Sequence, residues 1–71
     1  MKHLSVMDSL DHALSRLAGE LAVSNAILSM RLYGSRGERR YLERASGLLD
    51  QADQRGADTS KARRLLACYS L

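Results

Sequence analysis

The segment Leu4–Leu32 constrains the fold of this chain more than any other feature. Its second half, Leu17–Met30, is mostly apolar and contains one charged residue, Glu20. Along the segment, residues suited to a helical seam recur at steps of three and four, the heptad spacing of paired helices. They are Met7, Leu10, Leu14, Leu17, Leu21, Ser24 and Leu28. The spacing predicts one long helix, from about residue 5, where Ser5 and Asp8 form a capping box, to about residue 33.

Apolar residues of this helix also lie away from the heptad stripe. These are Ala22, Val23, Ala26, Ile27 and Met30. A helix that is apolar on more than one side is buried from more than one side. The rest of a small chain can cover one side, and a second copy is the simplest cover for the other. We therefore expect a symmetric homodimer whose interface is the heptad set, with the choice between parallel and antiparallel open.

The size of the chain favours the same conclusion. A domain of 71 residues has a marginal core, and one cysteine excludes an intramolecular disulfide. Oligomerisation or unusually good helix packing remains. The chain has no proline, phenylalanine or tryptophan and is rich in leucine and alanine, which favours helix throughout. We expect a single all-α domain over residues 1–71.

Two shorter helices are predicted after the long one. Gly34 is expected to end the first helix, and a second capping box, Ser35 to Glu38, to begin a helix over about residues 36–55. Its apolar face is Tyr41, Leu42, Ala45, Leu48, Leu49 and Ala52, and Gly47 is expected to permit close approach to the first helix. Gly56 ends it, and Asp58 or Thr59 caps a third helix over about residues 59–69. The apolar face of that helix is Ala62, Leu65, Leu66 and Tyr69.

No pattern of residues indicates catalysis or metal binding. His3, His12 and Cys68 lack the spacing of a metal site, and His12 falls on the polar side of its helix. Cys68 is expected to be a buried or half-buried thiol. Ser24 and Asn25 interrupt the apolar stretch, and two interpretations stay open: they fix the register of the paired helices, or they lie at the edge of the seam. We expect no catalytic, cofactor or metal site.

Positive charge gathers between the first two helices. The net charge is +3, and the segment 31–44 holds five arginines against two glutamates, whereas residues 1–30 hold two bases against three acids. Arginine suits carboxylates and phosphates alike. Candidates for contact with a partner are Val23, Met30, Tyr33, Arg36, Arg39, Arg40 and Arg44. The preferred function is an inhibitor that occupies a host protein, and the alternative is a small dimeric nucleic-acid-binding regulator that uses this basic segment.

In size and layout the whole chain resembles the small helical antagonists that bacteriophages direct against host proteins, among them quorum-sensing anti-activators and anti-CRISPR proteins. The resemblance implies a phage protein that binds a host regulatory or defence protein. No motif carries the resemblance, so no functional residue is transferred. Compact plasmid RNA-binding hairpins have a similar build and support the alternative. The N-terminus lacks the apolar core of a signal peptide, no stretch is long and apolar enough to span a bilayer, and a cytoplasmic location is expected.

Overall fold

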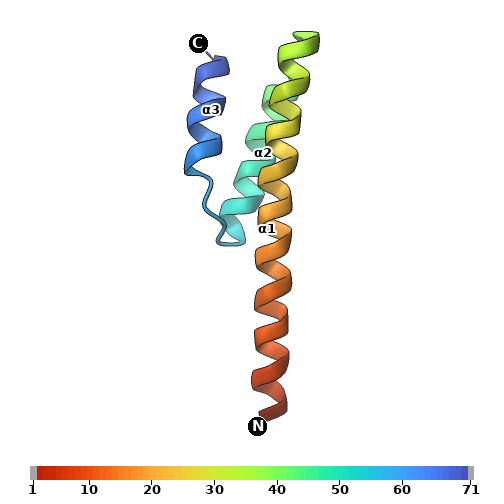
Figure 1. Cartoon of the computed structure of the whole chain (residues 1–71), viewed down its shortest axis with the longest axis vertical. Coiled ribbons are helices and arrows are strands. Elements are labelled where there is room, and N and C mark those ends of the chain that lie inside the picture. The colour runs from red at the N-terminus through yellow and green to blue at the C-terminus, as the bar shows by residue number, and fades with distance from the viewer. Residues whose placement is uncertain (1, 71) are drawn as a thin grey trace.

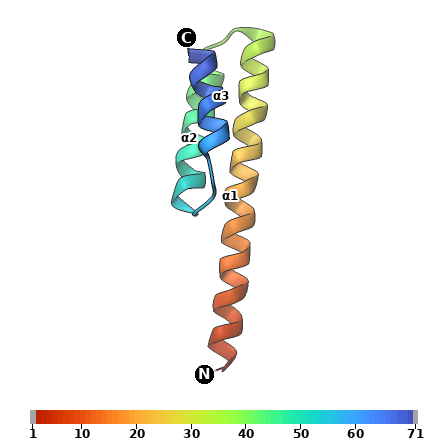
Figure 2. The ribbon, with the colours of Figure 1, turned by 60° about the vertical axis from the view of Figure 1, so that its left-hand side comes forward.

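Three helices form the part of the chain that the structure describes, which confirms the all-α prediction. The computed structural model describes the backbone of residues 2–70 and the side chains of residues 9–69. The helices are α1 (Lys2–Arg36), α2 (Arg40–Gln54) and α3 (Ser60–Ser70), with no strand in these residues. They run up, down and up, and α2 and α3 form a hairpin against the C-terminal half of α1 (Figures 1 and 2). The N-terminal half of α1 extends beyond the hairpin, so the molecule measures 52 × 18 × 12 Å.

Helix α1 is longer than predicted at both ends. It includes Ser5 within its first turns, so the predicted capping box does not mark its start. It continues through Gly34 to Arg36, and Gly37 takes the left-handed conformation, with φ of 70°. The Gly37 amide donates to the Tyr33 carbonyl at 2.7 Å, which satisfies a carbonyl of the last turn. The prediction that Gly34 ends the helix was wrong. Gly34 is accommodated inside α1, and Gly37 is the glycine that takes the left-handed conformation after the last turn.

Helix α2 begins at Arg40, later than predicted, and ends as predicted. Arg39 occupies the N-cap position with no side-chain capping bond, so the capping box proposed for residues 35–38 is wrong. At the other end Gly56 has φ of 82°. The Gly56 amide donates to the Asp53 carbonyl and the Ala57 amide to the Ala52 carbonyl, both at 3.0 Å. This pair of bonds is a Schellman motif, the helix ending that a C′ glycine favours.

The core lies between the hairpin and one face of α1. It consists of Ala26, Met30, Ala45, Leu49 and Ala62, with Val23, Ile27, Leu48, Leu66 and Tyr69 packed around it. The predicted apolar face of α2 is confirmed, since five of its members are buried and Leu48 is half-buried. The face predicted for α3 is confirmed for Ala62, Leu66 and Tyr69, but Leu65 is exposed. Alanines on α1 and α2 meet in this core, which lets the two helix backbones approach closely.

A glycine on α1 permits a close approach of the hairpin. A Cβ atom on Gly19 would lie 3.1 Å from the Ala57 Cβ and 3.2 Å from the Arg55 Cβ. Gly19 is buried beneath the turn between α2 and α3. Close approach was predicted for Gly47 instead, and that was wrong, because nothing lies within 4 Å of a Cβ built there. Gly19 lies on the same side of α1 as Ala22, Ala26 and Met30, and the helical pattern alone could not show that the hairpin packs against this side.

Candidate functional site

Among the side chains that the structure describes, six leucines of α1 are exposed along one line of the helix. We call this set the leucine face: Leu10, Leu14, Leu17, Leu21, Leu28 and Leu32. Their exposed fractions run from 40% to 61%, in a molecule whose core side chains are nearly fully covered. At 3.6 residues per turn the six directions fall within an arc of about 60°. Monomeric proteins rarely expose a contiguous apolar line of this length, and such patches mark interaction sites.

The leucine face and the core face lie on nearly opposite sides of the same helix. Ala22, Ala26 and Met30 point into the hairpin and are buried, while Leu14, Leu21 and the other leucines point away from it. The hairpin covers one of the two apolar sides of α1, and the side for which a second copy was predicted as the cover is exposed in the single chain. Of the predicted seam, Leu10, Leu14, Leu17, Leu21, Ser24 and Leu28 are exposed, and Met7 lies outside the residues whose side chains the structure describes. Leu32 also belongs to the exposed set, but it departs from the strict heptad and the spacing therefore did not predict it.

Two of the predicted partner-binding residues belong to the core instead. Met30 is fully buried, and Val23 is half-buried against the core cluster. The expectation that they offer exposed contact sites is wrong, because the hairpin already covers the side of α1 on which they lie. Tyr33 is half-buried too, and its ring meets Tyr69 edge to face at 5.9 Å and 85°. These three side chains stabilise the subunit and leave the arginines as the exposed candidates.

A groove between α1 and α2 adjoins the leucine face. Its volume is about 280 Å³, and its lining residues are Asn25, Leu28, Ser29, Leu32, Arg44 and Leu48. Leu28 and Leu32 belong to the leucine face, so the groove continues that apolar surface toward α2. Arg44 is exposed and places a positive charge on the α2 side. We call this feature the α1–α2 groove.

Four exposed arginines surround the connection between α1 and α2. This arginine corner consists of Arg36, Arg39, Arg40 and Arg44. The Arg40 guanidinium lies 5.1 Å from the centroid of the Tyr41 ring, and its Nε lies 2.6 Å from Oε2 of Glu38. The hydrogen bond to Tyr41 and the charge of Glu38 raise the pKa of Arg40. Arg40 is thus held in place, beside a hollow of about 330 Å³ that it lines with Tyr41 and Arg44.

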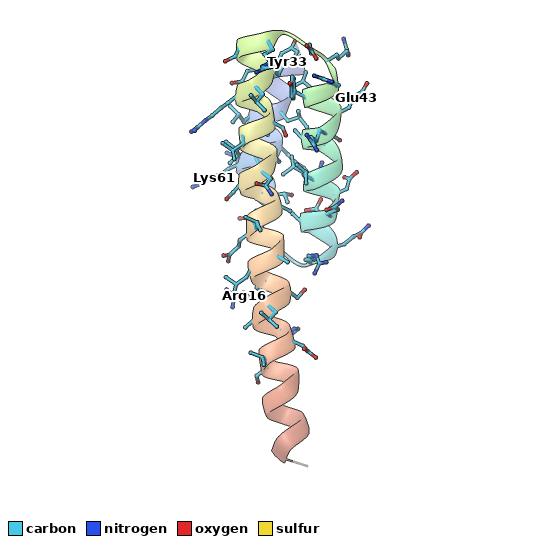
Figure 3. The ribbon with its side chains drawn as sticks, turned by 90° about the vertical axis from the view of Figure 1, so that its right-hand side faces the viewer. Arg16, Tyr33, Glu43 and Lys61 are labelled. Carbon is cyan, nitrogen blue, oxygen red and sulfur yellow. The ribbon has the colours of Figure 1, made fainter. Side chains whose placement is uncertain are left out.

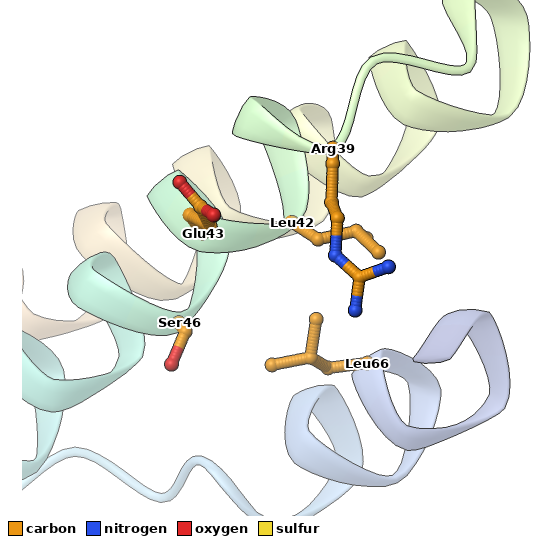
Figure 4. Close-up of a pocket in the computed structure, with 5 residues that line it drawn as sticks. All are labelled: Arg39, Leu42, Glu43, Ser46 and Leu66. Carbon is orange, nitrogen blue, oxygen red and sulfur yellow. The ribbon is translucent and has the colours of Figure 1, made fainter. Parts of the chain in front are cut away.

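Arg39 points toward α3 rather than toward Glu43, four residues further along the chain (Figure 4). Figure 4 shows its side chain extending past Leu42 toward Leu66, away from Glu43. With Ser46, these four residues line a second hollow, of about 300 Å³, between α2 and α3. No ion pair between Arg39 and Glu43 occurs among the described side chains, and both charged groups are exposed. The corner therefore keeps most of its positive charge available.

The acidic residues near the second turn are occupied by polar contacts within the chain. Arg63 pairs with Asp50 at 3.0 Å and also with Asp53, and the buried Thr59 hydroxyl donates to Asp53 at 2.6 Å. The Thr59 hydroxyl and then Arg63 lower the pKa of Asp53. Asp58 accepts from the hydroxyl and the amide of Ser60, which lower its pKa and satisfy the start of α3. These contacts fix the hairpin turn.

A basic hollow lies where α1 leaves the hairpin. Its volume is about 440 Å³, and its lining residues are His12, Ser15, Arg16, Gln54, Arg55 and Gly56. Figure 3 places Arg16 on α1 just beyond the turn of the hairpin. His12 is exposed as predicted, but Cys68 is exposed where a buried or half-buried thiol was expected, because α3 meets α1 along a different side. Among the described residues no group of three or more His, Cys, Asp and Glu is gathered to hold a metal.

Comparisons with protein families, with characterised proteins and with solved structures found no match for this chain. Within the described residues, no helix has a stretch long and apolar enough to cross a membrane. The function is therefore inferred from the exposed surfaces of the chain. They are the leucine face, the α1–α2 groove beside it and the arginine corner.

Proposed function

We propose that this protein is a non-enzymatic binding module, a homodimer that inhibits a host protein by occupying it. The observation that carries the proposal is the leucine face, six leucines exposed in one line on the side of α1 that the hairpin leaves uncovered. Full burial of a leucine contributes about 1.5–3 kcal/mol, so covering these half-exposed side chains favours association by roughly 1 kcal/mol each. A second copy presents the same surface, which is the self-complementarity that a two-fold dimer requires.

The arginine corner supports the second half of the proposal. Arg36, Arg39 and Arg44 are exposed, and the described ion pairs do not involve them. Planar guanidinium groups recognise carboxylates, so an acidic protein surface is the partner chemistry that the corner fits best. The acids nearest the second turn are held by Arg63 and Thr59, and they do not neutralise this corner.

The dimer is tested by sedimentation equilibrium. The wild-type chain is expected to sediment at twice its mass of 7.9 kDa and Leu21→Glu at the mass of one chain. Gln51→Glu is the matched control, because it adds the same charge to an exposed site on α2 and should stay dimeric. A Leu21→Glu protein that remains dimeric would overturn the assignment of the leucine face.

The partner is tested by affinity capture from a lysate of the encoding organism's host. Wild type is expected to retain one protein at a fixed ratio, and the triple variant Arg36→Glu, Arg39→Glu, Arg44→Glu to lose it. Gln51→Glu again serves as the control. Recovery of RNA or DNA that dissociates steeply as salt rises would instead support the nucleic-acid alternative and contradict the inhibitor.

A further inference from the structure

We propose that the second copy binds antiparallel, with the N-terminal half of its α1 seated beside the α1–α2 groove and its Asp11 against Arg44. The inference rests on the proposed homodimer and deepens it. Within one subunit the two halves of α1 differ. The hairpin supports the C-terminal half, whereas the N-terminal half projects beyond it (Figures 1 and 2). Antiparallel pairing places each projecting half against the supported half of the other subunit, and parallel pairing leaves the projecting halves to support each other.

The leucines are arranged almost symmetrically about Leu21. When Leu21 faces its own copy in an antiparallel pair, Leu14 faces Leu28 and Leu10 faces Leu32. A parallel pair requires no such symmetry, because each residue then faces itself. The exception is Leu17, which meets the exposed Asn25. The leucine face thus fits a second copy of itself in reverse direction.

Charge also separates the two directions. Arg31 is exposed and continues the heptad series through Leu17 and Ser24, so a parallel pair would place Arg31 next to its own copy. Both arginine corners would then lie at the same end of the dimer, and like charges in register are destabilising. Antiparallel pairing separates the two arginine corners, so that each lies beside the N-terminal half of the other subunit's α1, where Lys2 and Arg16 are balanced by Asp8 and Asp11.

The geometry of the two-fold axis leads to one specific contact. The step from Asp11 to Ser29 is five whole turns at 3.6 residues per turn, so Asp11 points along the side of α1 that faces the groove. The two-fold axis of an antiparallel pair is perpendicular to both α1 helices. This side of α1 therefore faces the same direction in both subunits. Asp11 therefore arrives near Ser29 and Leu32 of the partner subunit, beside the partner's Arg44. Neither Asp11 nor Arg44 has an ion-pair partner among the described residues of its own chain.

Disulfide crosslinking tests the direction. In a Cys68→Ser background, Leu21→Cys alone is expected to form a covalent dimer, and Leu10→Cys alone is not. A mixture of the Leu10→Cys and Leu32→Cys chains should form the mixed dimer. Rapid crosslinking of Leu10→Cys to itself would overturn the antiparallel arrangement while leaving the dimer intact. A wild-type chain that is monomeric at every concentration would instead overturn the proposed homodimer.

Charge reversal tests the contact. Asp11→Arg or Arg44→Asp alone is expected to raise the dimer dissociation constant about tenfold, since two copies of the pair are lost and replaced by repulsion. The double variant should return it to within about threefold of wild type. Glu20→Arg is the matched control, because Glu20 is exposed on the flank away from α2, and it should change the constant less than threefold. Failure of the double variant to recover would overturn the placement of Asp11 beside Arg44.

Discussion

At the scale of single residues, the side chains that hold the subunit together are small. Alanines at 26, 45 and 62 fill the centre of the core beside Met30 and Leu49. Gly19 is smaller still and lies where the turn between α2 and α3 meets α1. The close packing of the hairpin therefore depends on small side chains at these positions, and on the lack of a side chain at Gly19.

Two of the helical glycines, Gly19 and Gly47, offer a pair of contrasting substitutions. Gly19→Leu should lower the free energy of unfolding by roughly 1–2 kcal/mol, because a side chain there meets Ala57 and Arg55 and overpacks the site. Gly47→Ala should raise it by up to about 1 kcal/mol, because the position is helical and open. Chemical denaturation followed by circular dichroism, at one chain concentration, measures both. If Gly19→Leu and Gly47→Ala changed the free energy of unfolding equally and in the same direction, the packing described for Gly19 would be contradicted.

The turn before α3 should make stability depend on acid pH. The pKa of Asp53 is lowered in the folded chain by Thr59 and Arg63, so the unfolded chain takes up a proton at higher pH than the folded chain does. The contribution is complete above the ordinary value of 3.8 and is lost as pH falls through the lowered one. The melting temperature of Asp53→Asn should be lower than that of wild type at pH 7. The difference between the two melting temperatures should become smaller as the pH falls from 5 to 3. A difference in melting temperature that does not change with pH would contradict a lowered pKa of Asp53 in the folded chain.

At the scale of helices, α1 has two faces with different tasks. One face packs against the hairpin through Ala22, Ala26 and Met30, and the opposite face carries the exposed leucines. Periodicity predicted three helices, the apolar face of α2 and the double-sided character of α1, because these follow from spacing alone. It could not decide which side of α1 the hairpin covers. For that reason Met30 was predicted to be a contact residue and is instead part of the core.

The helix boundaries were also predicted only where the local sequence determines them. Gly56 was identified correctly because no other glycine lies near the end of the predicted helix. Gly34 was wrong because Gly37, three residues later, satisfies the same rule, and the local pattern does not choose between two glycines. The candidate surfaces were predicted in part. The heptad identified most of the leucine face, whereas the α1–α2 groove depends on how the two helices pack against each other.

The two halves of α1 should differ in hydrogen exchange when the dimer is broken. In Leu21→Glu, amides of residues 9–16 should exchange much faster than those of 22–30, because only the latter are covered by the hairpin. In wild type the N-terminal half should gain protection as chain concentration rises. Exchange measured by mass spectrometry after peptic digestion reports both segments. Concentration-independent exchange of residues 9–16 in wild type would contradict the proposed dimer.

At the scale of the whole molecule, one chain is a long helix with a short hairpin at one end. Substitution of the leucine face is therefore expected to separate association from folding. If the heptad leucines formed the core of the subunit, a charge at Leu21 would both dissociate and unfold the protein. The structure places Leu21 outside the core cluster, so the Leu21→Glu chain should keep its hairpin.

Solution scattering should detect a dimer that grows in width rather than in length. An antiparallel pair centred near Leu21 overlaps the two α1 helices almost completely, so the longest dimension should stay near the 52 Å of one chain while the mass doubles. The Leu21→Glu chain, at half the mass, is the reference for the single subunit. A longest dimension near twice that of one chain would indicate end-to-end association and contradict side-by-side pairing of α1.

The division of α1 between a covered and an uncovered face also bears on how this sequence can change over time. A substitution among the leucines alters which chains associate, and it leaves the alanines and Met30 that fold each chain untouched. Folding and association can therefore be altered independently within a single helix. A lineage can acquire a new binding specificity without passing through an unfolded intermediate sequence, as long as Gly19 and the core face are kept.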